Sequence, residues 1–254
     1  MFMDVSLNIE QLSEAYAKAR NRILFLDYDG TLVPFRDRPE KSFPGNDTRA
    51  LLKNLSSDPK NRVYIISGRT RDFLDSRFRG IHLGLIAEHG FMVREPDGQW
   101  IARVHADTAW KREAVNRLSP VNGRFPGSFI EEKESSVVFH FRTAGKKAEE
   151  GAVPLLREIV SGLQICFPGL ELLEGNKVIE IKPGNFNKGD TAAFILRKGN
   201  YDFILAAGDD VTDEQLFAGL GDTAITIKIG YSDTSAKYRI ASRVRFLDFL
   251  KGLS

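Results

Sequence analysis

The 254-residue sequence predicts an α/β protein with a doubly wound, Rossmann-like parallel sheet and an inserted α+β domain. Three observations predict this fold. Strand-like and helix-like segments alternate through the first third of the chain, as they do in parallel sheets. The alternation gives way to hairpin-like strands at about residue 91 and returns after Pro183. We therefore expect a core formed by residues 1–107 and 184–254, with an inserted domain over residues 108–183.

The first part of the predicted core contains three strands that alternate with helices. The segment "IEQLSEAYAKAR" repeats apolar residues at helical spacing and leads into the apolar strand "ILFL" at residues 23–26. A capped helix is then predicted for residues 46–55 and a buried strand for residues 62–67. A helix over residues 70–78 and a strand that begins at residue 83 complete this part.

From about residue 91 the pattern differs, which indicates antiparallel strands. Residues 91–104 resemble a hairpin that turns at Pro96, Asp97 and Gly98. Strand patterns at 128–142 and 177–183 are accompanied by helical patterns at 108–118 and 147–163. After Pro183 the core pattern returns, with helices predicted near 188–198, 213–219 and 246–253 and strands near 202–210 and 223–229.

Composition and charge limit the classes of function. Hydrophobic residues make up 42 % of the chain, which is ordinary for a globular protein, and the formal net charge is +2. Since no dense lysine and arginine block is present, we expect no nucleic-acid partner. Since no apolar run approaches the roughly 18 residues of a membrane span, we expect no membrane partner.

The single cysteine and the N-terminus predict a cytoplasmic protein. Cys166 excludes an internal disulfide, which suits a reducing compartment, and its apolar neighbours favour packing in a core. The N-terminus has acidic residues where a signal peptide needs a basic end and an apolar centre.

Two acidic residues follow the first core strand directly. In "ILFLDYDGTLVPF" the apolar run leads into Asp27 and Asp29, and then into Gly30 and Thr31. In open α/β sheets, ligands bind at the edge formed by the carboxyl ends of the strands. Two carboxylates this close resist ionising together unless a cation lies between them. The pattern therefore favours a cation site over a simple turn.

Polar residues also follow other core strands or begin a helix beside them. They are Ser67, Arg69, Lys188, Asp209, Asp210 and Asp213. A hydroxyl, an ammonium and a magnesium ion held by carboxylates are the groups that stabilise a transferring phosphoryl group. The sequence therefore predicts phosphoryl-transfer chemistry with a hard cation.

Other motif-based interpretations fail on spacing or context. The Asp27 motif lacks the later ligands and the glycine of an EF-hand loop, and no phosphate-binding P-loop is present. The Gly-x-Gly-x-x-Ala match at residues 219–224 follows a helix and precedes a strand, the reverse of the dinucleotide-binding context. The four histidines have no zinc-ligand spacing.

Taken in chain order, the motifs resemble those of the haloacid dehalogenase-like (HAD) phosphohydrolases. That superfamily has Asp-x-Asp-Gly-Thr, a Ser or Thr, a Lys and Gly-Asp-Asp-x-x-Asp, which here are residues 27–31, Ser67, Lys188 and residues 208–213. Further segments resemble the trehalose-6-phosphate phosphatases within it, from about residue 23 to 230. They are "LDYDGTL", "ISGR", "AEHG", "EEKESSVVFHFR", "VIEIKP", "NKG" and "GDDVTDE".

The resemblance implies magnesium-dependent hydrolysis of trehalose 6-phosphate, the final step of trehalose biosynthesis, through an aspartyl-phosphate. Asp27 would be the nucleophile and Asp29 the general acid and base. Mg2+ would be held by Asp27, the main-chain carbonyl of Asp29 and Asp209, with Asp213 as a further ligand or as an acceptor behind the ligands. The phosphate would be bound by Thr31, Ser67, Gly68, Arg69 and Lys188.

The resemblance also makes the inserted domain a cap that covers the site and contacts the sugar. Glu131, Lys133 and Glu180 would bind the substrate. His140 and Arg142 would either bind the substrate or lie on a solvated strand face. The candidates Glu88 and His89 either belong to the site or only shape the turn after their strand.

Two other functions stay open. One is a phosphatase of another sugar phosphate, such as sucrose 6-phosphate or a mannosyl compound. The other is a non-catalytic regulator that binds a sugar phosphate, and the presence of both Asp27 and Asp29 disfavours it, because a binder needs no nucleophile paired with an acid. Since no glycosyltransferase segment precedes the motifs, we expect a stand-alone phosphatase or an excised domain, with a trehalose-phosphate synthase as a partner to test.

Overall fold

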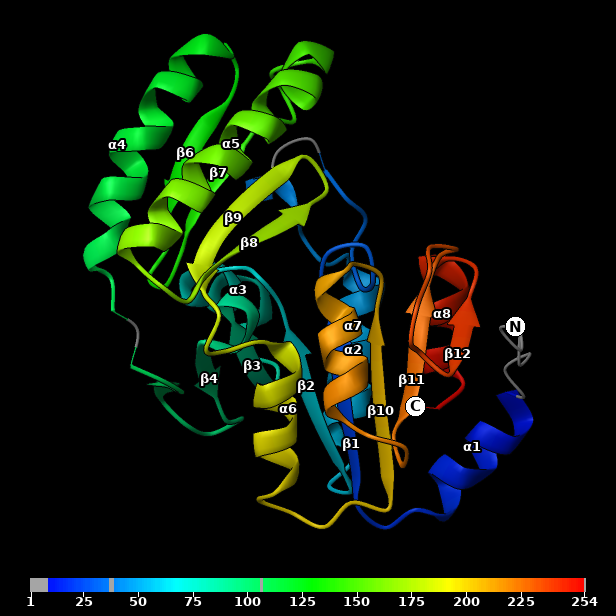
Figure 1. The fold of residues 1–254 in the computed structure, drawn as a ribbon. Helices are drawn as coiled ribbons and strands as arrows, with labels where there is room; N and C mark the ends of the chain where they lie inside the picture. The colour runs from blue at the N-terminus through cyan, green and yellow to red at the C-terminus, as the bar shows by residue number, and fades with distance from the viewer. Residues whose placement is uncertain (1–8, 37–38, 106, 254) are drawn as a thin grey trace. The chain divides into compact units, whose positions relative to one another are not determined.

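The computed structural model describes residues 9–36, 39–105 and 107–253 (Figure 1). These residues form two compact units. The first contains the described residues up to Arg103 and those from Asn187 onward, and the second contains Val104–Phe186. Each unit has its own β-sheet and its own hydrophobic core.

An eight-stranded sheet forms the centre of the first unit. Its order is β12-β11-β10-β1-β2-β3-β4-β5, parallel from β12 to β3 and antiparallel at β4 and β5. The strands are β1 (Arg22–Asp27), β2 (Asn61–Ile66), β3 (Gly84–Ala87), β4 (Met92–Arg94), β5 (Trp100–Ala102), β10 (Phe203–Gly208), β11 (Ile225–Ile229) and β12 (Tyr238–Ile240). The predicted doubly wound α/β fold is confirmed.

Helices cover this sheet because its central strands are apolar on both faces. All six residues of β1 are buried. Helices α6 and α7 pack together and share a core with Ile23, Phe25 and Tyr64, while α2 packs on β2 and contacts α8. The helices are α1 (Ile9–Lys18), α2 (Asn46–Ser57), α3 (Arg71–Phe78), α6 (Lys188–Leu196), α7 (Thr212–Gly219) and α8 (Arg243–Lys251), with short 3-10 turns η1 (Pro39–Lys41) and η2 (Glu88–Gly90).

The chain order creates a switch point between β1 and β10. From β1 the chain continues to β2 and β3 on one side, and after the second unit it returns to β10 on the other side of β1. The two strands are parallel, with Leu26 opposite Ala207. In doubly wound sheets the carboxyl ends of the strands at such a point form the ligand crevice.

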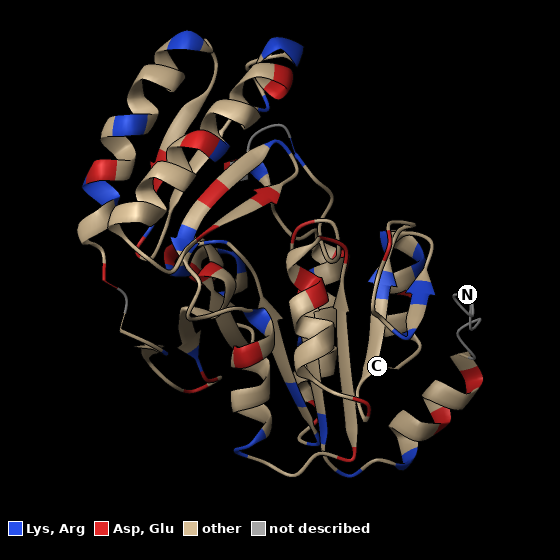
Figure 2. Ribbon diagram, viewed as in Figure 1, with Lys and Arg blue, Asp and Glu red and all other residues tan. Residues whose placement is uncertain are grey.

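The second unit is a four-stranded antiparallel sheet with two helices. Its order is β6-β7-β9-β8, and one face packs on the helices through a core that includes Val137, Phe139, Ile179 and Ile181. The elements are α4 (Ala109–Arg124), β6 (Phe129–Glu132), β7 (Val137–His140), α5 (Lys146–Cys166), β8 (Leu170–Gly175) and β9 (Val178–Pro183). Figure 2 shows charged residues along β8 and β9.

Several details differ from the sequence-based expectations. Strands β8 and β12 were not predicted. Helix α4 continues through Pro120 to Arg124 because Leu118 and Val121, on either side of the proline, are both buried in the same core. Packing there outweighs the lost backbone hydrogen bond. The expected packing of Cys166 is wrong: this last residue of α5 is exposed. No helix in the described part of the chain is long and apolar enough to cross a membrane.

Candidate active site

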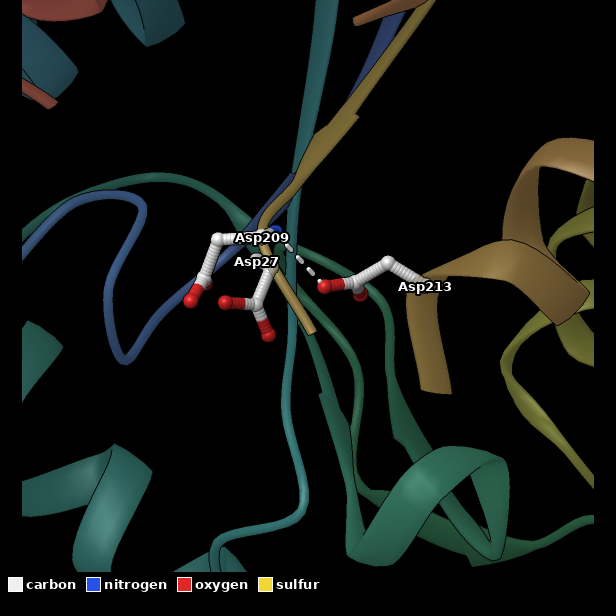
Figure 3. A group of neighbouring side chains, drawn as sticks. All are labelled: Asp27, Asp209 and Asp213. Carbon is white, nitrogen blue, oxygen red and sulfur yellow. Dashed lines mark hydrogen bonds between the residues drawn. The ribbon is translucent and has the colours of Figure 1, made fainter. Parts of the chain in front are cut away.

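Three carboxylates meet at the switch point of the main sheet. Asp27 is the last residue of β1, Asp209 follows β10 directly, and Asp213 lies in the first turn of α7. Figure 3 shows the three side chains together, and each offers an oxygen that lies within 4.8 Å of the others. The register of β1 and β10 accounts for the first two, since Leu26 and Ala207 are neighbours in the sheet.

Two glycines allow these carboxylates to approach the backbone. Gly30 has a φ of +87°, a backbone conformation that residues other than glycine rarely adopt. A side chain at this position would also overlap the carboxylate of Asp209. A side chain at Gly208 would overlap the carboxyl group of Asp213. The glycines of the two acidic motifs thus make room for the cluster.

A buried lysine joins two of the carboxylates. Lys188 begins α6, and its ammonium donates to Asp27 Oδ1 and to Asp213 Oδ1, each at 2.7 Å. The side chain is only 2 % exposed, so this charge needs partners. Burial acts to lower the pKa of Lys188, but the attraction of Asp213 and Asp27 outweighs it and raises that pKa. The lysine is therefore held charged between the acids.

The remaining negative charge suits a divalent cation. Burial raises the pKa of Asp27 well above its usual value, and repulsion by Asp213 raises it further. Burial and Asp213 also raise the pKa of Asp209 to about 7. Three carboxylates with one ammonium leave two formal negative charges when all are ionised. Because carboxylate oxygens are the ligands that hard cations prefer, these residues fit a bound divalent metal.

The three acids are not equivalent in this cluster. Asp213 is fully buried, and its Oδ2 accepts hydrogen bonds from the backbone nitrogens of Asp209 and Asp210, each at 2.9 Å, while its Oδ1 accepts from Lys188. Among the described residues, Oδ2 of Asp27 and Oδ2 of Asp209 accept no hydrogen bond. Asp27 and Asp209 are thus suited to coordinate a metal directly. Asp213 is suited to hold the backbone of Asp209 and Asp210 in place.

Thr31 lies against this cluster. The residue is fully buried, and its hydroxyl donates to Asp209 Oδ1 at 3.1 Å. This contact orients one candidate metal ligand. Phosphate binding by Thr31 stays a prediction.

Asp29 lies beside the cluster and is held from two sides. Arg69 donates to it twice, from Nε to Oδ2 at 2.7 Å and from Nη2 to Oδ1 at 2.8 Å. Ser42 donates to Oδ1 at 3.2 Å. Sequence reasoning missed Ser42, because nothing in its loop distinguishes it from an ordinary polar residue. Phosphate binding by Arg69 stays a prediction, and the structure pairs this side chain with the candidate general acid.

The loops after β2 and β3 are joined by backbone hydrogen bonds. Ser67 is only 2 % exposed, and its backbone carbonyl accepts a hydrogen bond from the backbone nitrogen of His89 at 2.9 Å. The backbone carbonyl of Arg69 accepts one from the backbone nitrogen of Glu88, also at 2.9 Å. A side chain at Gly68 would overlap the imidazole of His89. Glu88 and His89 have φ values of 49° and 56°, an uncommon conformation that marks local strain. The strained turn thus supports the loop that carries Ser67.

The candidate sugar-binding residues of the second unit form an ion pair and a histidine–carboxylate hydrogen bond on its sheet. Lys133 contacts Glu180 at 3.1 Å, with both side chains less than a tenth exposed, and Ser136 donates to the same carboxylate at 2.5 Å. His140 Nε2 lies 2.7 Å from Glu131 Oε2. The strand register places Glu131, Val138 and Glu180 side by side, on the face opposite the helix-packed residues.

Local contacts fix the charge of Glu131. Burial opposes its ionisation, but the hydrogen bond from His140 and the charge of Lys133 outweigh burial and lower the pKa of Glu131. The ring of Phe129 stacks on His140 with a centroid distance of 4.3 Å. Arg142 is set apart, since it donates to the carbonyl of Asn176 at 2.7 Å. Sequence reasoning missed Phe129 and Ser136, although Ser136 lies inside the quoted segment 131–142.

Comparisons of sequence place the chain among known proteins. A model of the trehalose-phosphatase family matches residues 25–244. The bifunctional trehalose-6-phosphate synthase/phosphatase of Thermoproteus tenax is 39 % identical over 234 residues, which are 92 % of this chain and 32 % of that protein. The trehalose-phosphatase of Schizosaccharomyces pombe is 35 % identical over an alignment of 268 positions that covers 98 % of this chain and 32 % of that protein. The chain spans about a third of the length of these curated relatives.

Comparisons of structure agree with the family match. The C-terminal domain of Candida albicans trehalose-6-phosphate phosphatase has a TM-score of 0.90 and 27 % identity, with 98 % of each chain covered. The C-terminal domain of a Candida albicans trehalose synthase regulatory protein has a TM-score of 0.77 at 18 % identity, with 98 % of this chain and 100 % of that chain covered, and shows the fold alone. From the family match over residues 25–244, the chain belongs to the trehalose-phosphatase family, within the HAD superfamily.

Proposed function

We propose that this protein hydrolyses trehalose 6-phosphate to trehalose and inorganic phosphate, with Mg2+ as its cofactor. The observation that carries the proposal is the buried group of Asp27, Asp209, Asp213 and Lys188 with Asp29 beside it. The group supplies a carboxylate nucleophile, a cation site and a proton-transfer group at one sheet edge. The named substrate of relatives such as the Schizosaccharomyces pombe trehalose-phosphatase suggests the sugar.

The proposed reaction has two steps that share Asp29. In the first, a carboxylate oxygen of Asp27 attacks phosphorus and the bond to the sugar oxygen breaks, while Asp29 gives that oxygen a proton. In the second, a water molecule attacks the aspartyl-phosphate and loses a proton to Asp29, and the bond between Asp27 and phosphorus breaks. Asp27 returns to its starting state and phosphate leaves.

The other residues of the first unit would hold the metal and the phosphate and balance their charges. Asp27, Asp209 and the main-chain carbonyl of Asp29 would hold Mg2+, with Asp213 behind them. When bound, the metal withdraws electron density from the phosphoryl oxygens. Lys188 keeps Asp27 in place and offsets its charge through the 2.7 Å contact. Ser67, Gly68 and Thr31 would contact phosphate oxygens at the same sheet edge.

Metal binding should be measurable without turnover. We expect Mg2+ to raise the melting temperature of the wild type, because a ligand that binds only the folded state adds about 2.7 kcal/mol at 100 times its Kd. Asp209→Asn should lose most of this shift, whereas Asp222→Asn, an exposed control, should keep it. Phosphate release should stop with a chelator and return with Mg2+, while calcium should inhibit. Full activity in excess chelator would refute the metal requirement.

The second unit is proposed as a cap that recognises the sugar. Its pair of Lys133 and Glu180 and the carboxylate of Glu131 offer charged hydrogen-bonding groups on one sheet face. The groups of the first unit would bind the metal and the phosphate, and the phosphate is common to every sugar phosphate. Selectivity for trehalose is therefore assigned to the cap. For His140, the contact with Glu131 suggests support of that carboxylate.

A substitution in the cap should separate sugar recognition from chemistry. Glu180→Gln should lower kcat/KM for trehalose 6-phosphate by roughly 10- to 150-fold, the equivalent of about 1.5–3 kcal/mol for a charged hydrogen bond. An aryl phosphate, which has no sugar to recognise, should lose far less. Glu174→Gln on β8 is a matched control, because Glu174 pairs at the exposed surface with Arg157. Equal losses on both substrates would assign Glu180 to folding.

The deciding experiment is a phosphate-release screen with and without Mg2+. The panel contains trehalose 6-phosphate, sucrose 6-phosphate, glucose 6-phosphate and a mannosyl phosphate. Highest kcat/KM on trehalose 6-phosphate is expected, and preference for another sugar would refute the substrate. A regulator is the second candidate: a Candida albicans trehalose synthase regulatory protein has the same fold, so the fold alone does not separate an enzyme from a regulator. Sugar-phosphate binding with no release of phosphate from any compound would support the regulator instead.

A further inference from the structure

The contacts of Asp29 form a closed ring of side chains that passes through the backbone carbonyl of Ser42. Arg69 donates to both carboxylate oxygens of Asp29, and its guanidinium lies over the ring of Phe73, 4.6 Å from the centroid. Arg77 lies over the same ring at 4.3 Å and donates from Nε to the Ser42 carbonyl at 3.1 Å. The hydroxyl of Ser42 then donates back to Asp29. The carboxylate is thus held by two loops and by the first helix after β2.

The backbone of Arg69 is fixed as well. Its nitrogen donates to Ser67 Oγ at 3.2 Å, and its carbonyl accepts from the Glu88 backbone nitrogen at 2.9 Å. The strained turn at Glu88 and His89 therefore supports the position of the guanidinium. The Asp29 and Arg69 side chains are 23 % and 21 % exposed, so water only partly screens their attraction. A bidentate arginine, which donates two hydrogen bonds to one carboxylate, fixes both the distance and the orientation of that carboxylate.

We propose that Arg69 and Ser42 are positioning residues that orient Asp29 for proton transfer, and that Arg69 acts through Asp29 and not as a phosphate ligand. The inference rests on the proposed function, in which Asp29 gives and takes the proton. Oδ1 of Asp29 accepts from Arg69 and from Ser42, whereas Oδ2 accepts from Arg69 alone among the described residues, so a lone pair of Oδ2 is open to the transferred proton. The hydrogen bonds from Arg69 and Ser42 keep the carboxylate aligned during the transfer.

Leaving-group dependence separates positioning of an acid from binding of phosphate. A sugar oxygen is a strongly basic leaving group that needs a proton as the bond to phosphorus breaks, whereas p-nitrophenolate leaves without one. The ratio kcat/KM reports only steps up to the first irreversible one, which is formation of the aspartyl-phosphate. A defect in Asp29 positioning should therefore appear in kcat/KM for the sugar phosphate and not for p-nitrophenyl phosphate. A lost phosphate ligand should affect both substrates.

The test compares Arg69→Ala with the wild type on these two substrates, with inorganic phosphate as an inhibitor. We expect kcat/KM for trehalose 6-phosphate to fall about 10- to 100-fold, part of the 10²–10⁴ that general acid catalysis supplies. The value for p-nitrophenyl phosphate and the inhibition constant of phosphate should change little. Arg69→Lys should not rescue, because an ammonium cannot make the bidentate contact. Arg71→Ala, an exposed arginine at the start of α3, is the matched control.

A double variant makes the test independent of the size of each loss. In Asp29→Asn, adding Arg69→Ala should cause no further loss on trehalose 6-phosphate, because residues that act through one group are not additive. Ser42→Ala should show the same substrate pattern as Arg69→Ala and carries the test if that variant fails to fold. Equal losses on both substrates, weaker phosphate inhibition or additive losses in the double variant would overturn the positioning role alone. A wild type that hydrolyses no sugar phosphate would overturn the proposed function first, and this role with it.

Discussion

Asp27→Asn is expected to abolish phosphate release from trehalose 6-phosphate. The amide keeps the size of the carboxylate but cannot serve as the nucleophile, and loss of a nucleophile lowers kcat by roughly 10⁴- to 10⁶-fold. The measurement is phosphate release at saturating Mg2+ and substrate. Turnover near the wild-type rate would refute attack by Asp27.

The same substitution should leave the fold intact. Burial and Asp213 raise the pKa of Asp27, which means that folding disfavours its ionised form. At pH 7 the unfolded chain carries this carboxylate ionised, so replacing it by a neutral amide removes an unfavourable burial of charge. Lys188 keeps Asp213 as a partner. We therefore expect an unchanged or higher melting temperature, which would separate the loss of activity from unfolding.

A labelling experiment distinguishes the two acids. Asp29→Asn retains the nucleophile and should trap label on the protein when it is mixed with a ³²P-labelled aryl phosphate, because removal of the phosphoryl group is slowed. Hydroxylamine should release this label, as it does from acyl phosphates. Asp27→Asn should take up no label. Equal labelling of the two variants would place the phosphoryl group on another residue.

The main features of the fold were predictable because they depend on strand periodicity and on where strands end. An apolar run such as residues 23–26 predicts a strand covered on both faces. Since the carboxyl ends of parallel strands share one edge, residues that follow two such strands lie close together. This reasoning anticipated that Asp27 and Asp209 would meet, as the register of β1 and β10 shows. The structure adds that both oxygens of Asp213 are already engaged.

The contacts that depend on loop geometry were not predictable. Ser42 lies 13 residues from Asp29 in a loop without regular pattern, and its hydrogen bond depends on how that loop returns to the sheet. The pairing of Arg69 with Asp29 depends on the loop after β2, which the turn at Glu88 and His89 supports. The spacing of a motif predicts that an arginine lies near the site, but not whether it contacts a phosphate or the carboxylate of Asp29.

Lys188→Met is expected to have the largest effect on stability, together with loss of activity. Removing one partner of a buried ion pair typically costs about 3–5 kcal/mol, because the remaining charge stays buried without compensation. Here Asp27 and Asp213 both lose a donor at 2.7 Å. Urea unfolding should give the loss in free energy, and hydrogen exchange at the amides of β1 and β10 should report it for the first unit.

Lys228→Met is the matched control for this prediction. Lys228 is equally buried, at 2 % exposure, but it pairs with Glu214, whose side chain is 26 % exposed and accepts other hydrogen bonds from Thr234 and Ser235. Water and these donors compensate the charge of Glu214 when the lysine is removed. The loss in unfolding free energy should therefore be clearly smaller for Lys228→Met than for Lys188→Met. A loss for Lys188→Met no larger than for Lys228→Met would contradict the charge balance inferred for the cluster.

Magnesium should narrow the stability difference between Lys188→Met and the wild type. Without the lysine, the three carboxylates repel one another more strongly, so a cation that binds among them relieves more unfavourable charge in the variant than in the wild type. The gap in unfolding free energy should therefore shrink as Mg2+ rises, while the gap for Lys228→Met stays constant. A gap for Lys188→Met that is independent of Mg2+ would show that the metal and the lysine do not compensate the same carboxylates, and it would place the cation away from Asp27 and Asp209.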